Sequence, residues 1–155
     1  MAGKRAKQRP TAVTNPSRKE APRTLPEGLP GSGNSHERLC WRFTHVDNDG
    51  PWGFSSVGGA VLCEILGHLK KFESMTLNEV FHYGGYPGKD YDVDAIPNSG
   101  ALARLEEAGL ADQTKIWVLR CGGKPRLYGF LQGNVFHVVF WDPEHEIWPS
   151  QLKHT

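Results

Sequence analysis

The sequence predicts a single α+β domain that begins with a strand, continues through two to three helices and ends in a three- to four-stranded antiparallel meander. Three observations carry this prediction. Residues 39–46 alternate with period two, and apolar residues recur at three- and four-residue steps over residues 57–72. Residues 115–141 contain three alternating segments that short, glycine-containing turns separate. Helices followed by several strands indicate helices packed on one face of a sheet.

The first elements follow from aromatic alternation and from a helical period. LCWRFTHV at residues 39–46 is typical of a strand, and the Asp, Asn, Gly and Pro residues of 47–51 then form a turn. The apolar stripe over residues 57–72 predicts an amphipathic helix that Ser55 or Ser56 would cap.

Two shorter helices are predicted next. Thr76 followed by Glu79 forms a capping box, which should start a short second helix. Residues 84–97 are rich in Gly, Pro and Asp, and we expect a loop there. Ser99 is the predicted cap of a third helix over residues 100–108.

The C-terminal third changes to period two. We expect strands over residues 115–121, 126–131 and 134–141, with Gln132-Gly133 as the tight turn between the last two. Residues 146–148 could add a last short strand.

Charge divides the chain of 155 residues into two parts, although the formal net charge is only +1. Residues 1–38 carry eight Lys or Arg and three acidic residues, a net +5, and the remainder is −4. Residues 1–37 are rich in proline and poor in large apolar residues, which predicts a disordered basic arm, so the folded domain spans 38–155. The arm could serve solubility or tether an acidic partner such as a nucleic acid.

The sequence predicts a protein that neither spans a membrane nor carries a secretory signal. No apolar run is long enough for a membrane span, and no apolar stretch follows the first positive charges as in a secretory signal. Cys40, Cys63 and Cys121 are widely spaced, so we expect neither disulfides nor a zinc site. We therefore expect a cytoplasmic protein without cofactor or metal.

Candidate functional side chains gather on the predicted C-terminal strands. Pairing through Gln132-Gly133 puts Tyr128 opposite His137 and collects several polar and aromatic side chains on one sheet face. Arginines bind phosphate, histidine transfers protons near neutral pH, and aromatic rings stack on bases. The expected shared face contains Arg120, Arg126, Tyr128, His137 and Trp141, with Lys124 and His145 at its ends.

Other interpretations stay open for these residues. An antiparallel sheet usually has one solvated face, on which Arg, Tyr and His are ordinary occupants. The spacing of Asp142 and His145 also fits a turn, a hydrogen-bonded pair that orients the imidazole, or a metal site that lacks further ligands.

The C-terminal third resembles a group of small uncharacterised bacterial proteins. The similarity lies in an Arg-containing strand, an R-L-Y-G strand at residues 126–129, the segment VFHVVFWDPEH at residues 135–145 and a Lys-His-Thr end. Further matches lie at residues 41–43, 72–76 and 102–105, so the resemblance spans roughly residues 39–155.

Strand order and the two arginines also resemble, more distantly, the RelE/ParE superfamily of toxins. That resemblance implies a small α+β fold and cleavage of messenger RNA on the ribosome without a metal. It makes Arg120, Arg126 and His145 the matching basic groups, with Tyr128 and His137 nearby. The family's nucleases are usually strongly basic, whereas the net charge of residues 39–155 is −4.

The leading functional expectation is a RelE-like endoribonuclease toxin. His145 or His137 would act as general acid or base, Arg120 and Arg126 would hold phosphate, and a cognate antitoxin would cover the site. Lys124, Tyr128 and Trp141 would bind substrate. The alternative is a non-catalytic protein-interaction module whose contact surface consists of aromatic residues: Trp52, Phe54, Tyr86 and Tyr91.

Overall fold

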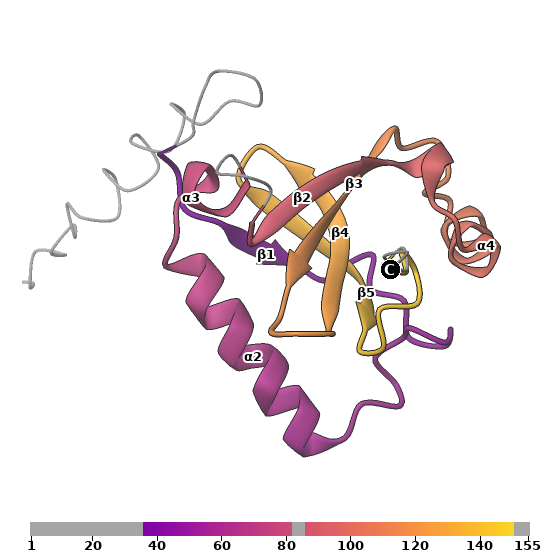
Figure 1. The fold of residues 1–155 in the computed structure, drawn as a ribbon, viewed down its shortest axis with the longest axis horizontal. Coiled ribbons are helices and arrows are strands. Elements are labelled where there is room, and N and C mark those ends of the chain that lie inside the picture. Colours follow the sequence, from indigo (N-terminus) through magenta and orange to yellow (C-terminus); the bar gives the residue numbers. More distant parts are fainter. Residues whose placement is uncertain (1–35, 82–85, 151–155) are drawn as a thin grey trace, which may run out of the picture.

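The computed structural model describes residues 36–81 and 86–150. It has the predicted α+β class: helices pack against a five-stranded sheet with the order β1-β5-β4-β3-β2 (Figure 1). All of the predicted basic arm except residues 36 and 37 lies outside the described part of the chain.

The helices and strands have the following bounds in chain order. They are β1 (Cys40–Arg42), α2 (Gly59–Glu73), α3 (Leu77–Phe81), β2 (Gly88–Asp92), η3 (Val93–Ala95), α4 (Ser99–Glu107), β3 (Lys115–Arg120), β4 (Arg126–Gln132) and β5 (Val135–Asp142).

Strand β2 corrects the expectation of a loop over residues 84–97. Its sequence, GKDYD, has a single large apolar residue because the strand lies at the sheet edge, antiparallel to β3. The Lys115 ammonium lies 2.8 Å from a carboxylate oxygen of Asp92 and 3.5 Å from one of Asp90, so cross-strand ion pairs accompany the pairing. The expected strand at residues 146–148 is absent from this described segment, which forms bends instead.

Strand β1 is shorter than predicted and pairs in parallel with β5, with Trp41 next to Phe136. The segment after Arg42 leaves the ladder and then returns to β5, where the Asp47 amide donates to the Val139 carbonyl over 2.9 Å. The predicted strand over residues 39–46 therefore includes part of the connection after β1, which returns to β5 at Asp47.

The helix termini show which capping predictions are correct. The Thr76–Glu79 capping box forms, since the Glu79 amide donates to Thr76 Oγ1 over 3.2 Å and the Thr76 amide to Glu79 Oε1 over 3.3 Å. Asn98 rather than Ser99 caps α4, because its side-chain oxygen accepts from two helix amides. Helix α2 begins after Gly58 and has no side-chain cap from a serine.

The β4–β5 hairpin turns at Gly133-Asn134, not at the predicted Gln132-Gly133, and contains a bulge. Gln132 pairs with Val135 and Gly129 with Val138, but Tyr128 pairs with Phe140. One additional residue of β5, Val139, is thereby accommodated. The bulge reverses which side chains of β5 face each side of the sheet.

Both faces of the sheet are covered, which corrects the expectation of helices on one face only. Figure 1 shows α2 and α4 on different sides of the strands. One apolar core includes Leu105 of α4, Tyr128, Phe140 and Ile147, and the other includes Phe72 of α2, Leu127 and Trp141. A strand buried on both faces needs a nearly continuous apolar run, and VFHVVFW in β5 meets that requirement.

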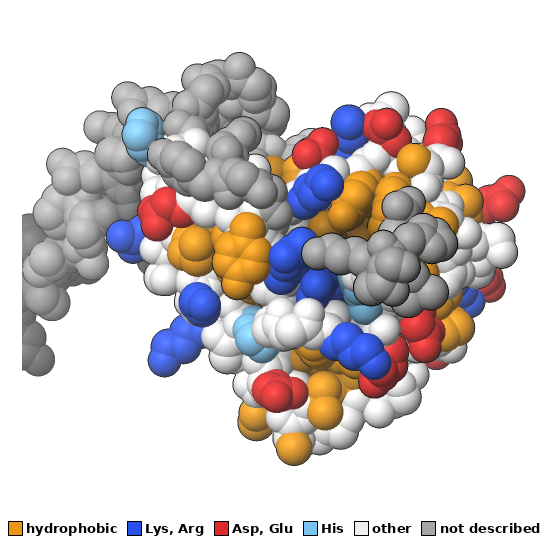
Figure 2. All heavy atoms as spheres, in the orientation of Figure 1, with side chains coloured by type: hydrophobic (Ala, Val, Ile, Leu, Met, Phe, Trp, Pro, Cys, Tyr) orange, Lys and Arg blue, Asp and Glu red, His pale blue; other side chains and the backbone are white. Residues whose placement is uncertain are grey.

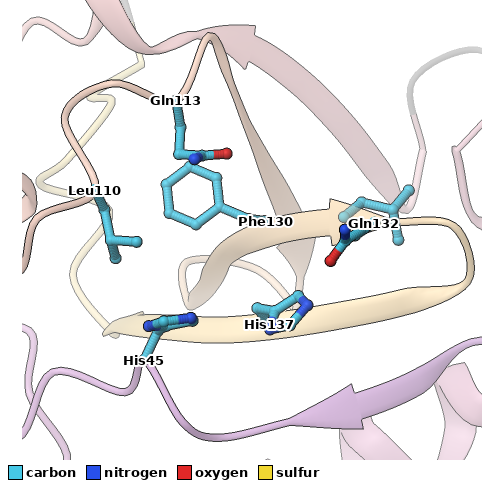
Figure 3. Close-up of a pocket in the computed structure, with 7 residues that line it drawn as sticks. His45, Leu110, Gln113, Phe130, Gln132 and His137 are labelled. Atoms are coloured by element: carbon cyan, nitrogen blue, oxygen red, sulfur yellow. The ribbon is translucent and has the colours of Figure 1, made fainter. Parts of the chain in front are cut away.

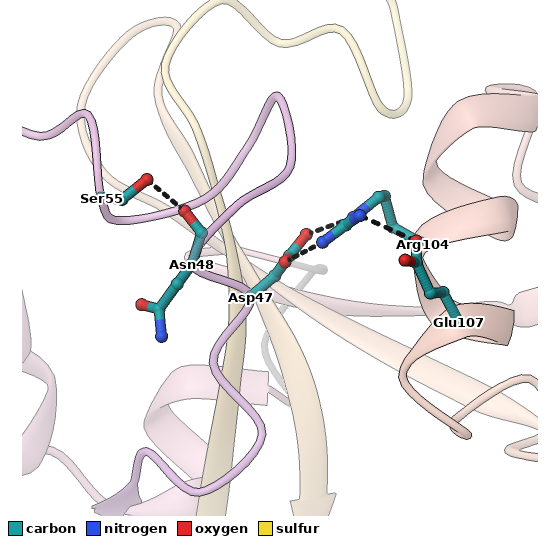
Figure 4. A network of polar contacts seen from close by, with 5 residues as sticks. All are labelled: Asp47, Asn48, Ser55, Arg104 and Glu107. Carbon is teal, nitrogen blue, oxygen red and sulfur yellow. Dashed lines mark hydrogen bonds and ion pairs between the residues drawn. The ribbon is translucent and has the colours of Figure 1, made fainter.

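An ion pair attaches α4 to the segment that follows β1. Arg104 donates through Nε to one oxygen of Asp47 over 2.9 Å and through Nη2 to the other over 2.5 Å (Figure 4). The Arg104 guanidinium lowers the pKa of the Asp47 carboxyl. Arg104 also pairs with Glu107 one turn along the helix. The Asp47–Arg104 pair therefore attaches the segment that follows β1 to α4, beside the core that contains Trp52 and Leu105.

No helix within residues 36–81 or 86–150 is long and apolar enough to cross a membrane.

Candidate functional site

A cationic pocket of about 230 Å³ lies where β3 and β4 approach their connecting turn. It includes four of the predicted site residues, Arg120, Arg126, Tyr128 and His145. Figure 2 shows Lys and Arg side chains gathered in the middle of one face of the molecule. The remaining lining residues are Pro87, Lys89, Tyr91, Val118, Trp148, Pro149 and Ser150.

Strand register brings the two arginines together. Arg120 ends β3 and Arg126 begins β4, and these two residues are direct cross-strand partners, so their side chains share one face. Like charges in such a pair repel each other. A pair of this kind is favourable when an anion lies between the two guanidinium groups.

Arg126 is the buried member of the pair, with only 8% of its surface exposed. Its Nη1 donates to the backbone carbonyls of Gly123, Lys124 and Pro125 at 2.8, 3.1 and 3.0 Å. Burial and the nearby Arg120 charge lower the pKa of the Arg126 guanidinium. Within the described residues it forms no ion pair with a carboxylate, which is unusual for a buried charge.

His145 reaches the pocket from the turn after β5 and has a φ of 58°. Asp142 builds this turn: its two carboxylate oxygens accept from the amides of Glu146 and Ile147 at 2.9 and 2.8 Å. Because both oxygens serve the turn, the Asp142 interaction is turn chemistry rather than a hydrogen bond that orients the imidazole. The Nδ1 atom of His145 lies 3.3 Å from Ser150 Oγ.

The protonation state of His145 follows from its surroundings. Burial lowers the pKa of its imidazole, and the charges of Arg126 and Arg120 lower it further, against an opposing effect of Asp142. The neutral form therefore prevails at pH 7 and can accept a proton.

Tyr128 contributes a hydroxyl and not a stacking surface. Tyr128 is fully buried, and its hydroxyl has no hydrogen-bond partner among residues 36–81 and 86–150. Burial and nearby acidic groups raise the pKa of the phenol, so it stays neutral and can donate a hydrogen bond. A buried donor without a partner is costly.

The remaining predicted site residues lie elsewhere. Trp141 faces the α2 core because of the bulge at Val139, so it does not share a face with the arginines. Lys124 is exposed in the β3–β4 turn, where its ammonium lies 2.8 Å from Glu144. Tyr128 is opposite Phe140 and not opposite His137 as predicted.

His137 belongs to a second pocket, of about 280 Å³, at the other end of β4 (Figure 3). It pairs with Phe130, and its ring centroid lies 5.7 Å from that of His45. Burial, His45 and Arg42 lower the pKa of the His137 imidazole. His137 and the arginine pocket are therefore separate features of the same sheet face.

The aromatic residues of the alternative interaction surface do not form one patch. Trp52 is 5% exposed and lies in a core, where its ring packs edge-on against Phe140. Tyr91 stacks on Trp148 with centroids 4.0 Å apart, whereas Tyr86 is 61% exposed. Phe54 lines an apolar groove beside α2.

Sequence reasoning missed two features of the arginine pocket. Lys89 and Tyr91 enter it from β2, the strand that the sequence did not reveal. Trp148 forms a wall together with Tyr91. The alternation of Lys89 and Tyr91 was the available signal, but three aspartates and a glycine nearby favoured a loop.

No group of three or more His, Cys, Asp or Glu residues that could hold a metal ion occurs in the described part of the chain. Comparison of the chain with protein-family models, curated proteins and solved structures finds no significant match.

Proposed function

We propose that the arginine pocket binds the phosphate of an RNA strand and that the protein is a RelE-like toxin that cleaves RNA without a metal. The observation that carries the proposal is the pair Arg120 and Arg126 beside a neutral imidazole. This pair has no carboxylate partner within the described residues. Two guanidinium groups on one face suit phosphate recognition.

The proposed reaction uses His145 as the general base. His145 takes the proton of the ribose 2′-hydroxyl, and the resulting oxygen attacks the adjacent phosphorus. The bond from phosphorus to the 5′-oxygen breaks, and that oxygen takes a proton from water. Arg120 and Arg126 stabilise the negative charge that develops on the phosphate.

The proposal brings expected partners with it. RNA, either free or on the ribosome, is the substrate, and a cognate antitoxin protein that covers the pocket would keep the toxin inactive in the cytoplasm. The modest size of the cationic patch within an acidic domain makes binding depend on local contacts rather than on the total charge.

The test is cleavage of end-labelled RNA by the purified protein, with and without ribosomes, together with growth on induced expression. We expect cleavage and growth arrest for the wild type and loss of at least about 100-fold in rate for His145→Gln, the usual contribution of general base catalysis. Arg126→Met should be inactive. His68→Gln, a half-buried histidine on α2 outside the pocket, is the matched control. A wild type that neither cleaves RNA nor arrests growth contradicts the proposal.

The apolar groove beside α2 favours the second candidate, a non-catalytic protein-interaction module. Leu62 and Leu66 are 45% and 52% exposed next to Phe43, which is 55% exposed, and apolar surface of this kind often contacts other proteins. Under this alternative, Leu66→Glu abolishes binding of a purified partner, whereas Arg126→Met leaves it unchanged.

A further inference from the structure

We propose that Tyr86 is a stacking platform for a nucleobase, so that the pocket takes the phosphate of an unpaired nucleotide. This inference rests on the proposed function and names its substrate class as single-stranded. The structural basis is the contact between the exposed Tyr86 ring and Arg120, the exposed guanidinium of the phosphate pocket.

The aromatic rings around the pocket differ in whether a base can reach them. Tyr128 is fully buried, and Trp141 faces the other core. Tyr91 and Trp148 stack on each other at an interplanar angle of 18°, and both residues are half-buried, so less of either ring is open to a base. Tyr86 is the most exposed large hydrophobic residue in the described part of the chain, at 61%.

Tyr86 is held next to the phosphate-binding groups. The Arg120 amide donates to the carbonyl of Pro87, the residue after Tyr86, over 2.9 Å. The Arg120 guanidinium carbon lies 5.5 Å from the centre of the Tyr86 ring. Arg120 therefore contacts the ring while it also faces Arg126 across the strand pair.

The Arg120 guanidinium and the Tyr86 ring are separated by 5.5 Å. One nucleotide can contact both groups, since its base lies next to its own phosphate. With the phosphate between the arginines, the base reaches Tyr86 only when it is not paired or stacked within a duplex. The arrangement thus favours single strands and is tolerant of sequence, because every base presents a π-face.

The test measures binding of fluorescent 2′-O-methyl RNA oligonucleotides, which lack the attacking hydroxyl, to the full chain. Tyr86→Ala should weaken binding of a single strand roughly 5- to 150-fold, the range for one lost base stack. Tyr86→Phe should keep the wild-type affinity because it keeps the ring. Phe43→Ala, at an exposed aromatic residue outside the pocket, is the matched control and should change nothing.

A second arm removes the base and not the ring. In a series of oligonucleotides, an abasic site is moved from one position to the next. At the position whose base stacks on Tyr86, the wild type and Tyr86→Ala should bind the abasic oligonucleotide equally weakly. In a separate comparison, a duplex should bind more weakly than the single strand. Equal affinity of wild type and Tyr86→Ala for every oligonucleotide overturns the inference. If Arg126→Met then still abolishes binding, the phosphate pocket stands without the platform. A wild type that binds no oligonucleotide overturns both proposals.

Discussion

At the scale of single residues, the pocket assembles groups whose surroundings oppose their charged forms. His145 is partly desolvated and faces two arginines, and Arg126 is buried without a carboxylate partner within the described residues. Arrangements of this kind cost stability, and perturbed groups cluster at functional sites. The residue types were visible in the sequence, but their burial was not.

The His145 environment predicts the pH dependence of the proposed cleavage. The imidazole must be neutral to act as a base, and its folded pKa lies below the ordinary value of 6.5. The rate should therefore be level above about pH 6.5 and fall only at lower pH. NMR titration of the imidazole checks this directly, and Arg126→Met should raise the pKa of His145. A wild-type pKa at or above 6.5 contradicts the prediction.

The Arg120–Arg126 pair predicts opposite effects on stability and binding. Arg120→Met removes an exposed charge that faces a like charge, so the free energy of unfolding should rise by about 0.2–1 kcal/mol. The same variant should bind phosphate-containing oligonucleotides more weakly. Urea denaturation and fluorescence binding measure the two quantities. A variant that is both less stable and binds normally would show that Arg120 is structural.

At the scale of elements, the β4–β5 hairpin decides which predicted site residues meet. Alternation along each strand could be predicted, and it places Arg120, Arg126 and Tyr128 on one face. The bulge at Val139 could not be predicted, because the sequence of β5 is apolar at almost every position and period two gives no sign of an additional residue. This bulge is why Trp141 left the predicted face.

Gly129 is the residue that makes the bulge possible. A Cβ atom there would collide with the His137 carbonyl oxygen and would lie 2.5 Å from a ring carbon of Phe136. We expect Gly129→Ala to lower the free energy of unfolding by about 1–3 kcal/mol or more. Gly67→Ala on α2, where a Cβ meets nothing within 4 Å, is the matched control and should stabilise by about 0.5–1 kcal/mol. Chemical denaturation measures both, and equal effects would contradict the role of the bulge.

At the scale of the whole molecule, two histidines couple folding to pH. The pKa values of His137 and His145 are lower in the folded chain than their ordinary value of 6.5. The unfolded chain thus binds more protons below that pH. The stability contributed by the neutral imidazoles is complete above about pH 6.5 and is lost as the pH falls through the folded pKa values.

Thermal unfolding at a series of pH values tests this coupling. The melting temperature should fall between about pH 6.5 and pH 5, before most carboxylates titrate. The double variant His137→Gln, His145→Gln should flatten that part of the curve. A wild type whose melting temperature is constant over this range contradicts the prediction.

The sequence by itself determined the fold class, the α2 and α4 helices, the Thr76–Glu79 cap and the three C-terminal strands, because these depend on local periodicity and capping. Only the tertiary structure decided that β2 joins the sheet, that both sheet faces are buried, and that His145 rather than His137 lies beside the arginines. Those outcomes depend on strand order and on a bulge, which arise from contacts between segments distant in the chain. No local pattern of residue types encodes them.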